Sequence, residues 1–434
     1  MRKIKDSGVE WIDTIPENWK VVPMKALFSF GKGLPITKDN LTDAGIPVIS
    51  YGQIHARWNS GVTTHKDLFR FVDAFYLETN AQSLVKKGDF IMADTSEDRE
   101  GCGNCAYIDT DDVIFAGYHT IILHSLSQSE NKYLAYLFLT DSWRSQIRKV
   151  VSGVKLFSVS RRILGSCSVI VPDNASEIVK FLDKQCASVN TLISNVQAQI
   201  EKLKAYKQSL ITEVVTKGLD PNVPMKDSGV EWIGSIPAHW ELPRIKNLFR
   251  LRNERNDEAD LSKVNLISLY TDLGVVQHSD IIETTGNRAV TAEGYKFVHR
   301  NDIVVNIILC WMGAVGMSKY DGVTSPAYDI YCPINETISE YYHYLFRTRR
   351  FNGECYRYGK GIMMMRWRTY STEFRAITVP YPPVDEQKGI VDYLNKKCAD
   401  IDKLISIKQS KIEKLEQYKR SLIYEYVTGK KEVS

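Results

Sequence analysis

The sequence has few cysteines, no long apolar run and almost no excess of either charge. Eight cysteines in 434 residues, of which only Cys102 and Cys105 lie close together, are too sparse for the disulfide framework of a small secreted protein. No stretch approaches the roughly 18 apolar residues of a membrane span, and the N-terminal residues lack the apolar core of a signal peptide. The 56 basic and 52 acidic residues leave a formal charge of only +4. These absences predict a soluble protein of a reducing cytoplasm that makes no contact with a membrane.

The motifs of common catalytic and cofactor sites are also missing. The chain has no Gly-x-x-x-x-Gly-Lys-Ser/Thr phosphate loop and no Gly-x-Gly-x-x-Gly after a predicted strand. Cys102 and Cys105 have the spacing of two metal ligands, but no second such pair completes the four ligands of a structural zinc. The eight histidines are scattered, so a serine or cysteine nucleophile has no evident base. We therefore expect no catalytic residue, metal or cofactor in this chain.

An internal repeat organises the sequence. Residues 5–12, Lys-Asp-Ser-Gly-Val-Glu-Trp-Ile, recur unchanged at 226–233, an offset of 221. A second match aligns 186–216 with 398–428 at an offset of 212, with 18 of 31 residues identical. Between these matches the residues diverge but keep short β-branched runs broken by Gly, Asn and Asp, which is typical of strands and turns. The chain is therefore predicted to hold two copies of one unit with different surfaces.

Each matched tail is predicted to be a long helix that pairs with the other tail. Apolar residues recur at alternating steps of three and four, the pattern of a coiled-coil seam, with lysines at 207, 408 and 419 on the same stripe. The seam residues are Val189, Ile193, Val196, Ile200, Leu203 and Leu210 in the first copy, and Ile401, Ile405, Ile412, Leu415 and Leu422 in the second. About 31 residues at about 1.5 Å each give a rod of roughly 46 Å, and neither rod buries its stripe alone.

These patterns predict an α+β protein with pseudo-two-fold symmetry. Two mostly β domains with flanking helices would be joined by two long helices that pack on each other as a coiled coil. With 44% hydrophobic residues the chain can bury cores of this size. The expected boundaries are 1–172 for the first domain, 173–219 for the first spacer helix, 220–383 for the second domain with a repeated opening segment at 226–240, and 384–434 for the second spacer helix.

Basic residues gather at matching places in the two copies. Residues 144–162 hold six Lys or Arg and no acid, and residues 347–368 hold seven against Glu354, so each tract carries +6. One basic run is most often a solvated face, but two at equivalent positions favour contact with a nucleic acid. Lys and Arg bind phosphates, and Arg also presents a bidentate fork to guanine. The predicted DNA-contacting residues are Lys32, Lys38, Gln53, Arg57, Lys155, Arg161 and Arg162 in the first copy, and Arg250, Arg252, Lys360, Arg366 and Arg368 in the second.

Two segments together resemble the specificity (S) subunit of Type I restriction-modification systems. Pro382-Pro-Val-Asp-Glu-Gln387, leading into the helix with Ile412-Glu-Lys-Leu415, is similar to the Pro-Pro-x-x-Glu-Gln opening of that family's helix. Asp6-Ser-Gly-Val-Glu-Trp11 with Trp19 is similar to the segment that leads into its target-recognition domains. The first copy departs from the pattern, since residues 171–177 read Val-Pro-Asp-Asn-Ala-Ser-Glu.

The resemblance implies a non-catalytic, prokaryotic cytoplasmic subunit that reads double-stranded DNA in the major groove. It further implies two target-recognition domains held apart by two antiparallel helices. Each domain would read one half of a bipartite site, and the helices would set the gap, since a rod of roughly 46 Å spans a DNA turn of about 34–36 Å. The resemblance also implies two modification subunits, which bind S-adenosylmethionine and methylate adenine, and restriction subunits, which use ATP and Mg²⁺. These cofactors would sit on the partners, and none in this chain.

Two other functions remain open at the level of sequence. Tyr381-Pro-Pro-Val384 has some likeness to the Asn/Asp-Pro-Pro-Tyr/Phe motif of amino-methyltransferases, which suggests a stand-alone nucleic-acid-modifying enzyme. The coiled-coil pattern is also compatible with an adaptor that binds only proteins. Methyl transfer by the isolated chain would favour the enzyme, whereas DNA affinity indifferent to sequence would favour the adaptor.

Overall fold

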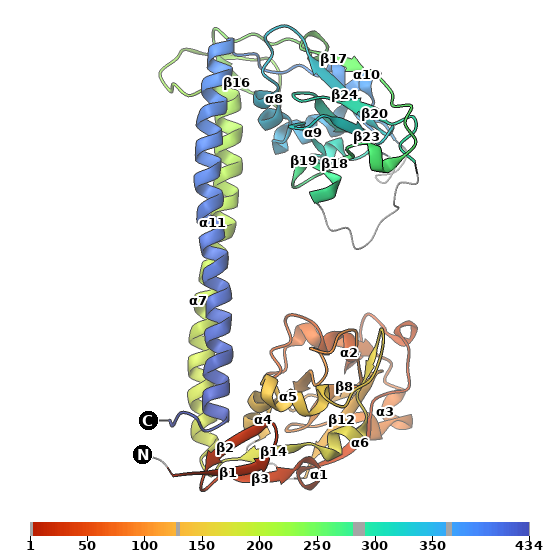
Figure 1. Cartoon of the computed structure of the whole chain (residues 1–434), viewed down its shortest axis with the longest axis vertical. Coiled ribbons are helices and arrows are strands. Elements are labelled where there is room, and N and C mark those ends of the chain that lie inside the picture. Colours follow the sequence, from red (N-terminus) through yellow and green to blue (C-terminus); the bar gives the residue numbers. More distant parts are fainter. Residues whose placement is uncertain (1–2, 127–130, 281–290, 362–366, 434) are drawn as a thin grey trace. The chain divides into compact units, whose positions relative to one another are not determined.

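The computed structural model describes residues 3–126, 131–280, 291–361 and 367–433 (Figure 1). The chain forms two compact units: unit 1 comprises Met1–Val196 and Ser410–Ser434, and unit 2 comprises Gln197–Gln409. Helices α7 (Ala175–Lys217) and α11 (Val384–Val427) each contribute one half to each unit. Among the described helices, none has both the length and the apolarity needed to cross a membrane.

Unit 1 is built around an antiparallel four-stranded sheet. Its strand order is β10 (Cys105–Tyr107), β8 (Phe90–Ala93), β12 (Thr120–Ser125) and β4 (Phe28–Lys32). A second sheet has the order β6 (Arg70–Val72), β5 (Ile46–Ile49), β11 (Ile114–Ala116) and β7 (Leu84–Val85). The described part of unit 1 also has three separate strand pairs: β1 (Ile4–Val9) with β2 (Ile12–Pro16), β3 (Lys20–Pro23) with β14 (Ser168–Val171), and β9 (Thr95–Ser96) with β13 (Phe157–Ser158). Its shorter helices are α1 (Met24–Leu27), α2 (Tyr51–Ile54), α3 (Tyr76–Thr79), α4 (Asn131–Phe138), α5 (Asp141–Arg148) and α6 (Arg161–Ser166).

Unit 2 repeats the main sheet in the same order. The equivalent strands are β22 (Val315–Met317), β21 (Ile303–Asn306), β24 (Tyr328–Pro333) and β17 (Phe249–Arg252). Its strand pairs are β15 (Met225–Asp227) with β16 (Ser235–Pro237), β18 (Ile267–Tyr270) with β19 (Gly274–Gln277), and β20 (Lys296–Val298) with β23 (Gly322–Thr324). Its shorter helices are α8 (Ser339–Phe346), α9 (Arg349–Tyr358) and α10 (Ser371–Ala376).

The identical opening segments of the two copies form the same turn. In unit 1 the amide of Gly8 donates to Asp6 Oδ1 at 2.8 Å, and in unit 2 Gly229 donates to Asp227 Oδ1 at 3.0 Å. Both glycines have positive φ, +71° and +67°, a conformation that side chains with a Cβ rarely adopt. Each turn leads to a fully buried tryptophan, Trp19 or Trp240.

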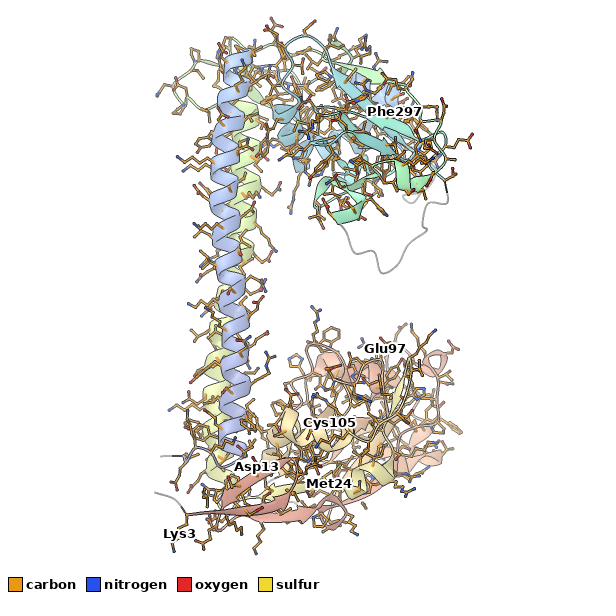
Figure 2. The ribbon with its side chains drawn as sticks, in the orientation of Figure 1. Lys3, Asp13, Met24, Glu97, Cys105 and Phe297 are labelled. Carbon is orange, nitrogen blue, oxygen red and sulfur yellow. The ribbon has the colours of Figure 1, made fainter. Side chains whose placement is uncertain are left out.

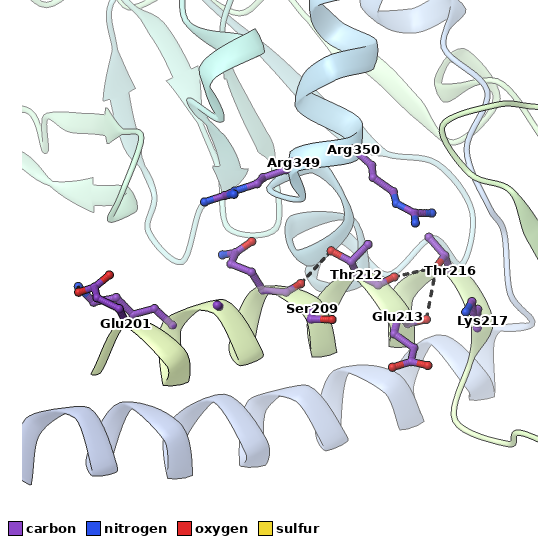
Figure 3. A pocket seen from close by; sticks show the side chains of 11 residues that line it. Glu201, Ser209, Thr212, Glu213, Thr216, Lys217, Arg349 and Arg350 are labelled. Carbon is purple, nitrogen blue, oxygen red and sulfur yellow. Dashed lines mark hydrogen bonds and ion pairs between the residues drawn. The ribbon is translucent and has the colours of Figure 1, made fainter. Parts of the chain in front are cut away.

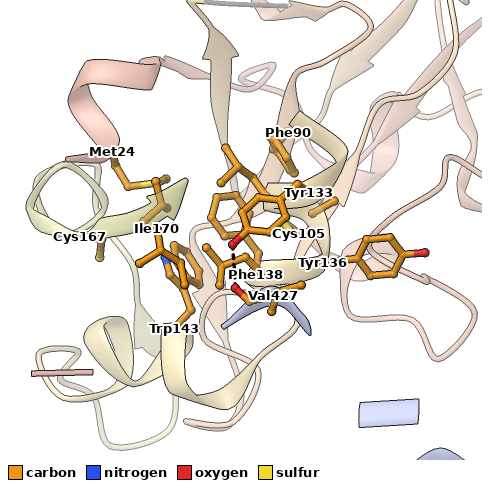
Figure 4. Packing of buried hydrophobic residues seen from close by; sticks show 14 of the residues in the cluster. Met24, Phe90, Cys105, Tyr133, Tyr136, Phe138, Trp143, Cys167, Ile170 and Val427 are labelled. Atoms are coloured by element: carbon orange, nitrogen blue, oxygen red, sulfur yellow. Dashed lines mark hydrogen bonds between the residues drawn. The ribbon is translucent and has the colours of Figure 1, made fainter. Parts of the chain in front are cut away.

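An aromatic core fastens the β-rich part of each unit to the end of a long helix. In unit 1, Phe138, Trp143 and Tyr133 are fully buried, and the Tyr133 hydroxyl donates to the carbonyl of Val427 at 2.7 Å (Figure 4). In unit 2 the equivalent hydroxyl of Tyr341 donates to the carbonyl of Val215, also at 2.7 Å. These hydrogen bonds satisfy carbonyls in the last turns of α11 and α7, which have no partner within the helix.

The long helices pair antiparallel, as predicted. Lys207 binds Asp402 in unit 2 at 2.7 Å, and at the equivalent place in unit 1 Lys419 donates to Asn190 at 2.9 Å. The third lysine on the stripe, Lys408, donates to Gln199 at 2.6 Å, so all three have polar partners across the seam. The expected seam residues that lie buried are Val189, Val196, Ile200, Ile401, Ile412 and Leu422, and those that lie half-buried are Ile193, Leu203, Leu210, Ile405 and Leu415.

The rod estimate of about 31 residues, taken from the matched tails, was too short, since α7 has 43 residues and α11 has 44. Both helices lie within the segments 173–219 and 384–434 that were expected to be spacer helices. The N-terminal turns, 175–185 and 387–397, are identical at 4 of 11 positions, a weaker match than the 18 of 31 in the tails, so the rod estimate left them out. They remain helical because they bury residues such as Leu182 and Leu394 in the two domain cores.

Candidate nucleic-acid interface

The main sheet of unit 1 brings several loops to one edge. β8 ends at Ala93, which lies opposite Thr120 at the start of β12, and Lys32 at the end of β4 lies opposite Ile121. The loop after β8 and the turn before β12 therefore leave the sheet together. In Figure 2, Glu97 of the first loop lies at the opposite end of the unit from Lys3.

A groove of about 860 Å³ opens at this edge. His55 anchors its floor, because its Nε2–H donates to the carbonyl of Thr95 at 2.9 Å and its Nδ1 accepts from the side-chain amide of Asn104 at 3.0 Å. These two bonds fix the orientation of the imidazole ring. Asn104 is thus held at the groove by a ring that is itself fixed to the loop after β8.

Aromatic rings gather around Tyr51 in the same place. Tyr51 packs edge-to-face with His55, Tyr118 and His119 at centroid distances of 6.4, 5.7 and 5.4 Å. His119 has a φ of 55°, a left-handed conformation that costs a non-glycine residue energy and is common at functional sites. Together with the exposed carboxylates of Glu97 and Glu100, the edge offers ring faces for stacking and acceptors for the amino groups of bases.

The basic tract of unit 1 divides into structural and free cations. Arg144 Nε donates to the carbonyl of Phe138 at 2.7 Å, and burial lowers the pKa of this arginine. Arg148 binds Asp141 and the carbonyl of Glu100, and Lys149 binds Glu10. The remaining three, Lys155, Arg161 and Arg162, are exposed and make no ion pair with any described residue.

The tract of unit 2 divides in the same way. Arg347 donates to the carbonyls of Val315, Thr271 and Asp272, and Arg357 pairs with Glu354. Lys360 is exposed but pairs with Glu373 at 2.6 Å. Arg368 is exposed with no described ionic partner, whereas Arg366 lies outside the described residues.

The two tracts are fastened to their sheets at equivalent points. The amide of Val159 donates to the carbonyl of Asp94, which follows β8, at 2.8 Å. The amide of Thr369 donates to the carbonyl of Ile307, which follows β21, also at 2.8 Å. The structure thus places the two basic segments at the same edge of equivalent sheets.

The other predicted contact residues have different surroundings. Lys32, Lys38, Arg57 and Arg250 are exposed. Gln53 caps its own helix, since its Oε1 accepts from the amide of Ser50 at 3.1 Å. Arg252 binds Asp302 with two nitrogens, at 2.9 and 3.2 Å, and also binds Glu254, so each of its three nitrogens already donates to a carboxylate. We therefore leave Arg252 out of the contact surface.

Tyr51, Asn104 and His119 line the groove, and none of the three was predicted from the sequence as a contact residue. These residues are far apart in the chain and lie in no recognisable motif, so only the sheet edge brings them together.

The pair Cys102 and Cys105 is buried, and burial raises the pKa of Cys105 to about 12.

A second groove, of about 710 Å³, runs along α7 in unit 2. Arg349 and Arg350 at the start of α9 line this groove together with Glu201 and Glu213 of α7 (Figure 3). The equivalent start of α5 in unit 1 has Asp141 and Ser142 instead. The starts of α9 and α5 therefore differ in charge, with two arginines in unit 2 and an aspartate and a serine in unit 1.

Residues 16–202 match the family described as the Type I restriction modification DNA specificity domain. Over these residues the chain is similar to Type I DNA specificity domains. The chain is 22% identical over 451 residues to the type I restriction enzyme MjaVIII specificity subunit of Methanocaldococcus jannaschii, covering 96% of this chain and 93% of that protein. It is also 22% identical over 433 residues to a specificity subunit assigned to the MjaX system of the same organism, covering 96% and 95%.

A fold similarity to a solved structure extends over nearly the whole chain. A solved structure described as showing complex assembly and conformational transition of the type I R-M system superposes with a TM-score of 0.67. It covers 96% of this chain and 99% of the other at 13% identity, so it supports the fold alone. The predicted fold class is thereby confirmed.

Proposed function

We propose that this protein is the DNA sequence-specificity subunit of a Type I restriction-modification complex. Each unit would read one half of a bipartite site in double-stranded DNA with the loops at the edge of its main sheet. The coiled coil would set the gap between the halves.

One observation carries this proposal. The segments fixed by Val159–Asp94 and Thr369–Ile307 have the same backbone attachment but different side chains. Lys155, Arg161 and Arg162 in unit 1 and Arg368 in unit 2 are free to neutralise phosphates. A shared scaffold with divergent loops is what two readers of different half-sites require.

The repeated helix faces support docking of two copies of one partner. Glu201, Ser209 and Glu213 on α7 correspond to Glu413, Ser421 and Glu425 on α11 at the offset of 212. Identical partners require equivalent surfaces, and we propose that these partners are modification subunits. In this proposal they bind S-adenosylmethionine and methylate adenine, restriction subunits supply ATP- and Mg²⁺-dependent cleavage, and the present chain is not catalytic.

The proposal is tested by purifying the chain alone and together with its modification subunits. The chain alone should neither bind S-adenosylmethionine nor methylate DNA, and the complex should bind one duplex sequence in preference to others. Mapping methylated adenines should give two half-sites at a fixed gap. Methyl transfer by the chain alone, or binding by the complex that is indifferent to sequence, would contradict the proposal.

A further inference from the structure

The loop between α5 and β13 carries aliphatic side chains into solvent. Val154 is 98% exposed, and Val150 and Leu156 are 56% and 55% exposed. We call residues Val150–Leu156 the aliphatic loop. Such exposure of neighbouring aliphatic residues is unfavourable in water, at about 25 cal/mol per Å² of apolar surface left uncovered, and this indicates that something covers the loop in the functional state.

The base of this loop is firmly held. The strands β13 and β9 pair Phe157 with Ser96 and Ser158 with Thr95. A Cβ at Gly153 would approach the carbonyl oxygen of Leu156 to 1.9 Å, so only glycine fits this tight turn. The loop is therefore a preformed projection, and Val154 stands next to the turn that Gly153 makes.

Charge identifies the partner of the loop. Lys155 lies between Val154 and Leu156, and Arg161 and Arg162 begin α6, three residues after β13 ends. All three lack an ionic partner among the described residues. A surface that joins exposed aliphatic groups to unpaired cations complements a polyanion that also presents apolar groups. Leu156 also lines the groove beside Asn104, so the aliphatic loop borders the surface proposed to face the bases.

We infer that Val154 is a specificity-determining residue that contacts the 5-methyl group of a thymine in the half-site read by unit 1. In the major groove thymine is the base that presents a methyl group, and aliphatic side chains contact it. The adjacent cations would hold the neighbouring phosphates. This inference rests on the proposed function, because it assumes that unit 1 reads duplex DNA.

The test removes the methyl group and the side chain separately. Each thymine of both half-sites is replaced by deoxyuridine, which keeps the base pair and removes only the methyl group. The affinity of the complete methyltransferase complex is then measured for the wild type, for Val154→Ser and for the control Val113→Ser, which changes another exposed valine of unit 1, 53% exposed, before β11.

At one thymine the wild type and the control should lose about fourfold in affinity, the factor expected for one buried methyl group. Val154→Ser should lose about the same on thymine DNA and show no further loss on the deoxyuridine DNA. Its salt dependence should match the wild type, since no charge is changed.

Three outcomes would overturn the inference: equal deoxyuridine effects in all three proteins, no thymine in the half-site, or loss of subunit assembly in Val154→Ser with DNA affinity unchanged. The last would mean that a protein covers the loop. A wild-type complex that does not distinguish DNA sequences would instead contradict the proposed function itself, so the two failures can be told apart.

Discussion

Cations of the same charge have different roles in this protein. In the basic tract of unit 1, Arg144, Arg148 and Lys149 fasten α5 to its surroundings, whereas Lys155, Arg161 and Arg162 have no described ionic partner. A basic tract is therefore a poor guide to binding until the partner of each side chain is known.

Replacing Lys155, Arg161 and Arg162 together with alanine should weaken DNA binding by the complex. The slope of log K against log salt should fall by roughly three units, because each lost phosphate contact removes about one. The measurement is a binding titration across salt concentrations, with Lys25→Ala on the exposed surface of α1 as the control. An unchanged slope would show that these residues are only solvated.

His343 should make the stability of unit 2 depend on pH. Burial and the nearby Arg347 lower its pKa from 6.5 to about 3, and its Nδ1 accepts from the amide of Met317 at 3.1 Å. Below pH 6.5 the unfolded chain binds a proton that the folded chain rejects, so stability is full above pH 6.5 and falls toward pH 3. The expected slope is about 1.4 kcal/mol per pH unit.

Urea unfolding at several pH values should show this slope in the wild type but not in His343→Asn, whose side-chain oxygen can still accept from Met317. The equivalent residue of unit 1 is Ala135, so unit 1 should lack this contribution. Equal pH dependence in the wild type and the variant would rule out His343 as the source.

At the scale of elements, each recognition domain is attached at two places on the long helices. The N-terminal turns of the helix that follows it join its core, as with Leu182 in unit 1 and Leu394 in unit 2. The C-terminal turn of the other helix accepts a buried tyrosine hydroxyl, through Val427 in unit 1 and Val215 in unit 2. The sequence match of the helices thus reflects a shared attachment as well as a shared seam.

Tyr133→Phe and Tyr341→Phe form a matched pair of variants. Each should destabilise its own unit by about 1–3 kcal/mol, because a buried carbonyl loses its hydrogen-bond donor. Hydrogen exchange should show faster exchange in unit 1 for Tyr133→Phe and in unit 2 for Tyr341→Phe. Equal effects of either variant on both units would contradict this attachment.

At the scale of the whole molecule, both long helices run from one unit into the other. Their polar pairs across the seam, Lys419–Asn190 and Lys207–Asp402, occupy equivalent positions in the two units. The internal repeat therefore includes the polar pairs across the helix seam as well as the sheets of the two units.

Deleting one heptad from each helix tests whether the helices set the gap in the DNA site. Segments 195–201 and 407–413 are equivalent at the offset of 212, and Gln199 in the first binds Lys408 in the second. Their removal shortens each helix by about 10 Å, so the preferred gap should shrink by at most about three base pairs. Mapping methylated adenines measures the gap and identifies the two half-sites.

Each half-site should remain the same after this deletion, because the recognition loops are untouched. A deletion of one heptad from α7 alone serves as the control, since it disrupts the pairing without a matching change in α11. An unchanged gap in a complex that still methylates DNA would refute this role of the helices.

The sequence by itself determined the repeat, the two long helices and the matching positions of the basic tracts, because each depends on identity or periodicity within one stretch of chain. Only the tertiary structure decided which cations are free, because their partners lie far away in sequence. Lys149 binds Glu10, and Arg252 binds Asp302. The groove at the sheet edge was also decided only by the tertiary structure. Antiparallel pairing of β4, β8 and β12 brings together loops that share no motif in the sequence.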